Sequence, residues 1–362
     1  MSGKSNILEV FRFLHDAVFP QPGREGVSFA LAQRGGINEV LWKGGGERLV
    51  SIALEANDPS RVNAEYKYKI ELISGAGDYV TTQNESLKLI HSGLENDLVA
   101  VKDGFLFLKN LDGKEYGGVG TSGATALQHA YPAWDGYSFY EFVKLWRSYH
   151  LVPTSMKESG LTREGQILAE DGHNLSAWLM WIQAHSSEAF GRVSEALQDL
   201  FPEITSLRAI PTTEDRVYLA AKEKDLTRET RVFQMSDGFL VLTALLSLIY
   251  APPELAGTLV CIEEPENYLH PRLMETLVAL LRQARQELLN SRRTPTQFIL
   301  TTQSPYLVNQ FSLDEVVWIE KKNGETRAFR PTDKEHLRKL VEDKEIGLLG
   351  DLMYTDAIGD EK

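Results

Sequence analysis

Cysteine is nearly absent from this sequence, because Cys261 is the only one among 362 residues. A lone cysteine excludes a disulfide framework and a cysteine-based zinc site within the chain. No two of the eight histidines lie four residues apart, so the His-Glu-x-x-His pattern of a hydrolytic zinc site is absent. The sequence therefore favours neither a disulfide-stapled scaffold nor a zinc hydrolase.

Long apolar runs are also missing. No stretch approaches the ~18 consecutive apolar residues of a membrane span, and the N-terminus lacks the apolar core of a signal peptide. We therefore expect a cytoplasmic protein without membrane contact. Long heptad runs, internal repeats and low-complexity segments are absent too, so coiled-coil arms are not expected.

An excess of basic charge is lacking, since 51 acidic residues outnumber 38 basic ones and the net charge is −13. Any nucleic-acid contact would have to come from a local patch. The best candidate is a group of four arginines on or just past one side of a predicted helix: Arg282, Arg285, Arg292 and Arg293. A solvated helix face explains the same group more simply.

The apolar content is 43%, which is enough for a sizeable core. A chain of this length can form one large α/β domain with insertions or two domains. Within it, Leu259–Ile262 form a short apolar run, typical of a buried parallel strand. Glu263 and Glu264 follow directly. Because ligands bind beyond the carboxyl ends of parallel strands, we expect both carboxylates to face a binding crevice.

An acidic pair at a strand end suits nucleotide hydrolysis with magnesium. One carboxylate can hold the ion through its water shell, while the other accepts a proton from an attacking water. The simpler alternative is a strand followed by an acidic turn. Three further segments favour the nucleotide interpretation.

The first of these segments is Gly3-Lys4-Ser5, the second half of a phosphate-binding loop, with a helix predicted over 7–16. The second is Met235-Ser236-Asp237-Gly238, a cap whose backbone N–H groups can face a phosphate, before an apolar helix over 239–250. The third is a predicted strand over 298–302, which places Gln303 at its carboxyl end.

Together these segments resemble the ABC-type ATPase heads of the RecF, SMC and OLD group, and most closely the small bacterial predicted ATPases of the AAA family. The run Glu-Pro-Glu-Asn-Tyr-Leu-His-Pro over 264–271 is distinctive of that group, and the segment over 34–43 is also similar to it. The resemblance implies an α/β fold with a mixed or parallel core sheet, an antiparallel β lobe and a helical lobe. It implies a single head over 1–362, with lobes over 1–120, 121–205 and 206–362.

The resemblance also assigns roles to site residues. The Walker A and nucleotide-binding residues would be Gly3, Lys4, Ser5 and Asn6, and the signature motif would be Ser236, Asp237 and Gly238. Ser5 and Glu263 would hold Mg²⁺, Glu264 would be the general base, and Gln303 would take the place of the switch histidine. The implied cofactors are ATP and Mg²⁺, and the implied assembly is a head-to-tail homodimer acting in a nucleic-acid transaction, with a separate effector such as a nuclease as a further partner.

Three departures from the family pattern are visible: the first Walker A glycine is absent, Glu263 replaces Asp, and Gln303 replaces His. The sequence supplies only Met1, Ser2 and Gly3 before Lys4, whereas a complete loop uses about four residues and a preceding strand. We therefore expect a disordered or displaced N-terminus, an exposed sheet position, and weak or absent nucleotide binding. A scaffold or regulator with the ATPase fold and impaired catalysis stays open as an alternative, and a nuclease has little support.

The rest of the chain carries weaker signals. Short strands are predicted over 49–56, 65–73, 87–91, 98–101 and 105–109, with a hairpin turn at Asp103-Gly104. Helices are predicted over 137–149 and 175–184, the second with Asn174 as N-cap after the loop residue His173. The glycine-rich run over 117–123 is interpreted as a flexible connection. A last hairpin is predicted over 315–330, with its turn at Asn323-Gly324.

Overall fold

The computed structural model describes residues 3–46, 48–58, 61–75, 79–290, 296–330, 335, 339 and 349–354. Its helices are α1 (Lys4–Val18), α2 (Gly26–Ala32), α3 (Ile37–Val40), α4 (Tyr137–Lys144), α5 (Pro153–Met156), α6 (Leu175–His185), α7 (Ser187–Leu200), α8 (Asp237–Tyr250), α9 (Pro253–Ala256), α10 (Pro271–Asn290) and α11 (Pro305–Val308). None of these helices is long and apolar enough to cross a membrane.

The strands in the described part of the chain fall into five sheets. In chain order they are β1 (Leu49–Asn57), β2 (Ala64–Ser74), β3 (Val80–His91), β4 (Leu94–Asp97), β5 (Val99–Lys102), β6 (Phe105–Lys109), β7 (Glu115–Gly120), β8 (Trp146–Tyr149), β9 (Gly160–Leu161), β10 (Ile204–Pro211), β11 (Arg216–Glu223), β12 (Thr230–Arg231), β13 (Leu259–Glu263), β14 (Gln297–Thr301), β15 (Trp318–Lys322) and β16 (Glu325–Phe329). Parallel and antiparallel strands occur together with helices, which confirms the predicted α/β class.

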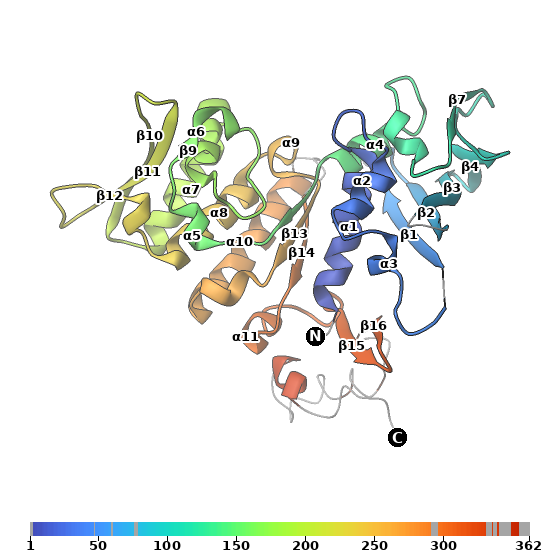
Figure 1. Cartoon of the computed structure of the whole chain (residues 1–362). Coiled ribbons are helices and arrows are strands. Elements are labelled where there is room, and N and C mark those ends of the chain that lie inside the picture. Colours follow the sequence, from blue (N-terminus) through green and yellow to red (C-terminus); the bar gives the residue numbers. More distant parts are fainter. Residues whose placement is uncertain are drawn as a thin grey trace. The chain divides into compact units, whose positions relative to one another are not determined.

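Contacts divide the chain into two compact units. Unit 1 contains Met1–Ser5 and Arg147–Lys362, and unit 2 contains Asn6–Trp146. The predicted boundaries after residues 120 and 205 do not coincide with this division. Figure 1 colours the chain by sequence, so that unit 2 runs from blue to green.

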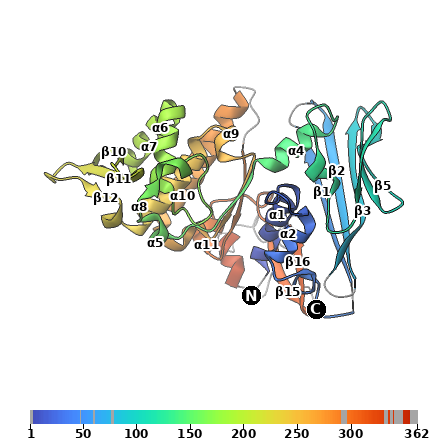
Figure 2. The same cartoon turned by 45° about the horizontal axis from the view of Figure 1, so that its top comes forward.

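Unit 2 is built on antiparallel strands. One sheet has the order β1-β2-β3-β4 and another the order β5-β6-β7. Figure 2 shows β1, β2 and β3 side by side, and β5 contacts β3. Asp103 and Gly104 both have positive φ between β5 and β6, as a two-residue type I′ hairpin turn requires. The predicted hairpin is therefore confirmed.

Buried and exposed side chains alternate along β2, and the buried ones form part of the core of unit 2. Tyr66, Tyr68 and Ile70 are at most 3% exposed, whereas the residues between them point outward. The rings of both tyrosines pack on Phe139 of α4, with centroids 5.3 and 5.7 Å away. On the outer face Lys67 pairs with Glu55. The outer face is thus a solvated, charge-paired surface.

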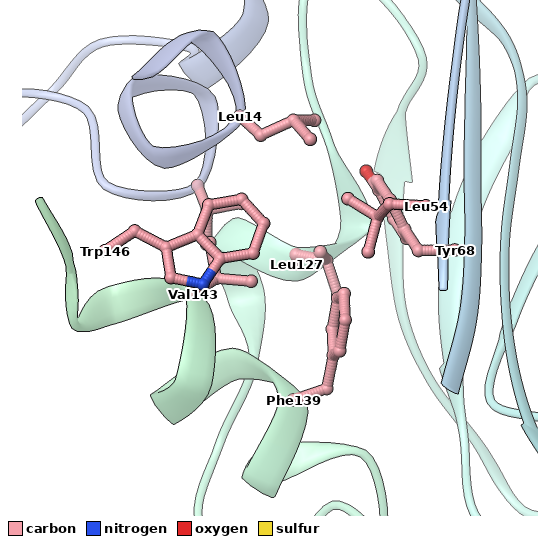
Figure 3. A pocket seen from close by; sticks show the side chains of 8 residues that line it. Leu14, Leu54, Tyr68, Leu127, Phe139, Val143 and Trp146 are labelled. Carbon is pink, nitrogen blue, oxygen red and sulfur yellow. The ribbon is translucent and has the colours of Figure 1, made fainter. Parts of the chain in front are cut away.

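A small apolar gap lies between α1, α4 and strands β1 and β2. Figure 3 shows Leu14, Leu127, Phe139 and Trp146 among the side chains that surround it. The gap has no room for a water molecule, so it is a packing defect and not a ligand site.

Three predictions of secondary structure are wrong in part. The helix predicted over 137–149 ends at Lys144, and Trp146–Tyr149 form β8, because pairing with β13 overrides the local helical pattern. The glycine-rich run is not simply a flexible connection, since β7 extends to Gly120 and pairs with β6. Asn174 occupies the N-cap position of α6 without a side-chain cap, because its buried amide bonds the backbone of Ala169, Glu164 and Ile167 instead.

Unit 1 is organised around α8. Phe239–Ile249 of this helix are buried throughout, as the apolar sequence predicts. The helix packs against α5, α7 and α10, and Figure 1 shows α6, α7 and α10 around it. Trp178 of α6 donates to Ser247 across this core at 2.9 Å, so its buried indole N–H has a partner.

The remaining sheets of unit 1 frame the site. The strands β14, β13 and β8 form one sheet in that order, with β13 parallel to β14. A second sheet joins β10, β11 and β12, with β9 paired to β11. The hairpin β15–β16 turns at Asn323 and Gly324, both with positive φ, which confirms the predicted turn; its strands begin three residues later and end one residue earlier than predicted.

A buried carboxyl group inside unit 2 yields a stability prediction. Glu85 is 1% exposed and accepts hydrogen bonds from Tyr68, Thr125 and the backbone N–H of Ala126. Replacement by alanine would leave three buried donors without acceptors, so Glu85→Ala should lower the free energy of unfolding by about 3 kcal/mol. Urea-induced unfolding followed by circular dichroism measures the change.

The stability that Glu85 contributes should depend on pH. Burial raises the pKa of Glu85 above its ordinary value of 4.5, against the lowering effect of its donors. Protonation therefore contributes stability that is complete below about pH 4.5 and is lost as the pH rises through the folded pKa. The gap between the parent and Glu85→Ala should shrink over that rise. Glu55→Ala, on the exposed face of the same sheet, should change little; an equal loss there would contradict the prediction.

Candidate functional site

The register of two parallel strands, β13 and β14, positions the residues of the candidate site. β13 is buried up to Ile262, and Glu263 lies opposite Thr301 of β14. The N–H of Glu264 then donates to the carbonyl of Thr301 at 2.9 Å. The residues that follow both strands consequently meet at one edge of the sheet, as predicted for the acidic pair and Gln303.

Glu264 holds a strained backbone and an ionised carboxylate. Its φ of 43° and ψ of 55° lie in the left-handed region, which non-glycine residues adopt rarely and often at functional sites. Gln303 Nε2 donates to one carboxylate oxygen at 2.6 Å, and Asn267 Nδ2 donates to the other at 3.2 Å.

These donors hold the pKa of Glu264 below its ordinary value. Gln303 has the largest effect and Asn267 the next, partial burial opposes them, and the charges of Lys4 and His150 add smaller lowering effects. The carboxylate is therefore negative at neutral pH and able to accept a proton or bind a cation.

Glu266 is a site residue that the sequence analysis did not assign. Its Oε1 accepts the N–H of Gln303 at 3.1 Å and the hydroxyl of Thr302. The side chain therefore fixes the chain after β14 and aims Gln303 at Glu264. The distinctive run over 264–271 was the available signal, but its partners lie 36 and 37 residues later in the chain.

The phosphate-loop segment joins this edge. Gly3 has a φ of +86°, and α1 begins at Lys4. Ser5 Oγ donates to Glu263 Oε2 at 3.4 Å, and the charge of Lys4 acts on Glu264. The structure thus brings Lys4 and Ser5 together with the acidic pair.

Gly3 also has a packing reason to be glycine. A Cβ atom at this position would lie 2.3 Å from the hydroxyl of Thr326 in β16. The hairpin β15–β16 therefore packs closely on the segment before Lys4. Met1 and Ser2 lie outside the described residues, as do Arg292 and Arg293, and Asn6 begins unit 2, so its predicted role stays a prediction.

His150 is a second residue that the sequence analysis missed. It follows β8, and its Nδ1 lies 3.5 Å from Glu263 Oε2. The imidazole is 61% exposed. The error in the predicted helix over 137–149 hid this residue, because only the pairing of β8 with β13 brings it to the site.

The signature segment occupies the start of α8. Ser236 is the N-cap, and its hydroxyl accepts the N–H of Phe239 at 3.3 Å. Asp237 pairs with Lys157 at 2.6 Å. A Cβ atom on Gly238 would lie 2.7 Å from the carbonyl oxygen of Tyr268, so this turn packs against the residues after the acidic pair. The predicted cap is confirmed, while its role toward a phosphate stays a prediction.

Cys261 takes no part in the chemistry. It is 1% exposed in the middle of β13, and burial raises the pKa of its thiol to about 12, with a smaller lowering effect from Ser148. A thiol in this state is neutral at physiological pH and does not act as a nucleophile.

The donors at the sheet edge fit magnesium. Mg²⁺ in nucleotide sites takes one or two protein oxygens and completes its shell with phosphate oxygens and water. Ser5 and Glu263 supply a hydroxyl and a carboxylate in contact with each other. Within the described ranges no group of three or more His, Cys, Asp or Glu residues could hold a metal ion, so a metal here depends on additional ligands.

Residues 144–309 match a family model described as "AAA domain, putative AbiEii toxin, Type IV TA system". This match confirms the predicted AAA-family resemblance for that part of the chain. It covers β13, β14, the signature segment and His150, but not Lys4 and Ser5. No curated protein matches the chain.

Several solved structures are similar to the chain at low identity. They include an Smc head bound to the winged-helix domain of ScpA (15% identity, 91% of this chain, 87% of that chain, TM-score 0.46), the SMC head domain from Thermotoga maritima (12%, 91%, 86%, 0.36) and an Smc head from Pyrococcus furiosus with an extended coiled coil, bound to the C-terminal domain of ScpA (13%, 95%, 90%, 0.40). TM-scores below 0.5 are too low to support conclusions about function or assembly.

The contacts of Glu266 give a prediction that does not depend on catalysis. Glu266→Ala removes the acceptor of the Gln303 N–H, and a hydrogen bond to a charged group contributes about 1.5–3 kcal/mol. The amide of Gln303 should therefore exchange with solvent about 10- to 100-fold faster, as measured by hydrogen exchange. Glu275→Ala on the exposed side of α10 is the control, and unchanged exchange in Glu266→Ala would contradict the assigned contact.

Proposed function

We propose that the protein binds ATP with Mg²⁺ and hydrolyses it. The observation that carries this proposal is the convergence of Lys4, Ser5, Glu263, Glu264 and Gln303 at one sheet edge, from three separate parts of the sequence. A cation, a hydroxyl, two carboxylates and an amide are the groups that phosphoryl transfer to water needs. The AAA-domain match over residues 144–309 supports the same conclusion.

Each residue has a distinct part in the proposed reaction. Lys4, in the first turn of α1, would neutralise the β- and γ-phosphates together with the helix N-terminus. Ser5 and Glu263 would hold Mg²⁺. The bound ion would neutralise charge on the phosphate oxygens.

Glu264 is the proposed general base. Its lowered pKa keeps it ionised, and its two oxygens are held by Gln303 and Asn267. Gln303 would orient the attacking water, and Glu266 would position Gln303 through the backbone.

We further propose that two copies assemble head to tail around the nucleotide. The signature segment supports this, because Ser236 is exposed at the start of a 14-residue helix whose N-terminal N–H groups can face a phosphate. Exposed aromatic side chains lie close in the chain to the signature segment, the acidic pair and Gln303: Phe233 is 59%, Tyr268 44% and Tyr306 63% exposed. Exposed aromatics of this kind are typical of interface cores.

Direct recognition of nucleic acid has less support. Lys67 and Lys69 of the β2 face pair with Glu55 and Glu71. Arg282 of α10 donates to Glu315 and to the carbonyl of Gln310. Because these charges are matched, the two surfaces attract a polyanion weakly. We therefore propose a role in a nucleic-acid transaction only for the assembled dimer. The dimer would act on the nucleic acid itself or through a separate effector protein.

Replacement of the proposed base tests catalysis. Glu264→Gln keeps the size of the side chain but removes the proton acceptor, so ATP binding should persist while hydrolysis falls by about 10² or more. Phosphate release measures turnover, and calorimetry measures binding. Glu275→Gln is the matched control. Equal turnover in Glu264→Gln and the parent would remove Glu264 from this role and favour an ATPase-fold scaffold.

Assembly has its own test. The Glu264→Gln variant should sediment as a monomer alone and as a dimer with ATP, because binding of the signature segment to the phosphates joins the two copies. Ser236→Arg in the same background should prevent the shift. A mass unchanged by ATP, or turnover strictly proportional to protein concentration, would count against the dimer.

A further inference from the structure

We propose that the free edge of strand β1 binds a second copy of this chain, and that two β1 strands pair antiparallel about a two-fold axis at Ala53. The interface lies wholly within unit 2, which contains neither the acidic pair nor the signature segment. It does not rest on the proposed ATPase activity, and it would join head-to-tail dimers to one another where those form.

β1 is a long strand with one open side. It pairs with β2 from Leu49 to Asn57 without a register shift, and in the described part of the chain β2 is the strand it pairs with. At one end of this ladder Ser74 donates to the carbonyl of Arg48, and at the other Asp58 donates to that of Ala64. Hydrogen bonding alternates along antiparallel pairs, so the odd-numbered residues of β1 direct their N–H and C=O groups outward. Among the described residues these outward groups form no backbone hydrogen bond.

The other edge strands of the described antiparallel sheets have features that discourage edge pairing. β4, β5, β9, β12, β15 and β16 are two to five residues long, and the pairing of β7 and of β10 is interrupted by a register shift. β1 has nine residues, no register shift, no proline, no lysine and a single charged residue, Glu55. An edge of this kind is a template for another strand.

The sequence of β1 is complementary to itself, which favours a second copy as the partner. In the register that overlaps all of Leu49–Asn57, Ala53 lies opposite the partner's Ala53, and odd-numbered residues meet odd-numbered residues. Every outward N–H and C=O group therefore gains a hydrogen-bond partner. Glu55 lies opposite the partner's Ser51, so the two Glu55 carboxylates are kept four residues, or about 14 Å, apart along the strands.

The free edge leaves apolar side chains on the inner face of β1 only half buried. Ile52 and Leu54 are of this kind, whereas Ile70 and Tyr68, which lie opposite them on β2, are 1% and 3% exposed. In the same register Ile52 meets the partner's Leu54, so pairing removes apolar surface from water. A single strand pair buries less than the ~1,200 Å² of a stable interface, so we expect weak association, with a Kd on the order of 10–100 µM.

Charged side chains placed at the two-fold axis test the pairing. The side chain of Ala53 is exposed beside Lys69 of β2, so a charged residue fits there in a single copy. Ala53→Glu or Ala53→Lys alone sets like charges directly opposite each other and should weaken association at least about 5-fold. An equimolar mixture of the two variants sets opposite charges there and should restore the parental affinity. Ser86→Glu is the matched control, since Ser86 lies on the other side of Lys69, within the sheet.

Sedimentation equilibrium of the full chain without nucleotide, from about 1 to 200 µM, measures the association. The parent and Ser86→Glu should be monomeric at the lowest concentration and approach the mass of a dimer at the highest. Circular dichroism checks that each variant folds. Restored association in the mixture would support the pairing, because mixing two misfolded variants cannot restore it.

Three outcomes would overturn the proposal. The first is a parent that stays monomeric throughout, and the second is equal weakening by Ser86→Glu. The third is a mixture that associates no more tightly than its separate variants, since only a two-fold axis at Ala53 brings the two new charges together. Association seen only with ATP would belong to the nucleotide dimer and would also contradict pairing through β1, whereas loss of ATP-dependent assembly alone would leave the pairing intact.

Discussion

The pairing of β13 with β14 is the contact on which the candidate site depends. It sets Glu263 opposite Thr301, and the N–H of Glu264 continues the ladder to the carbonyl of Thr301. Because side chains alternate along a strand, a slip of one residue would turn Glu263 to the other face of the sheet. Burial of Leu259–Ile262 specifies the register, so the apolar interior and the polar edge are fixed by the same pairing.

Glu264 shows how local strain is held at this edge. A left-handed backbone at a non-glycine residue costs of order 1–3 kcal/mol and persists only where its surroundings fix it. Here the backbone N–H is bonded to β14, the carboxylate is held by two amides, and Pro265 restricts the following residue. The resulting turn presents the carboxylate beyond the strand end, whereas a continued strand would direct it to one face of the sheet.

The sequence predicts those parts of the site whose signal is local. The apolar runs before Glu264 and Gln303 identify both strands, and the buried helix α8 follows from its composition. It does not predict β8, because the aromatic residues around Trp146 suit a helix as well, and only tertiary pairing with β13 selects the strand. It also does not predict the part of Glu266, whose partners are distant in the chain and become neighbours through the sheet register.

Unit 1 is formed by one segment that precedes unit 2 in the sequence and one that follows it. Ser5 and Glu263, which are in contact, are therefore 258 residues apart in the sequence. During synthesis on a ribosome, at about 5–20 residues per second, the acidic partner of Ser5 follows it by roughly 13–50 seconds. All of unit 2 leaves the exit tunnel in that interval and has time to fold by itself. The order of synthesis therefore makes the candidate site one of the last contacts to form, and a nascent chain stalled before β13 would hold Lys4 and Ser5 without the carboxylates that complete the site.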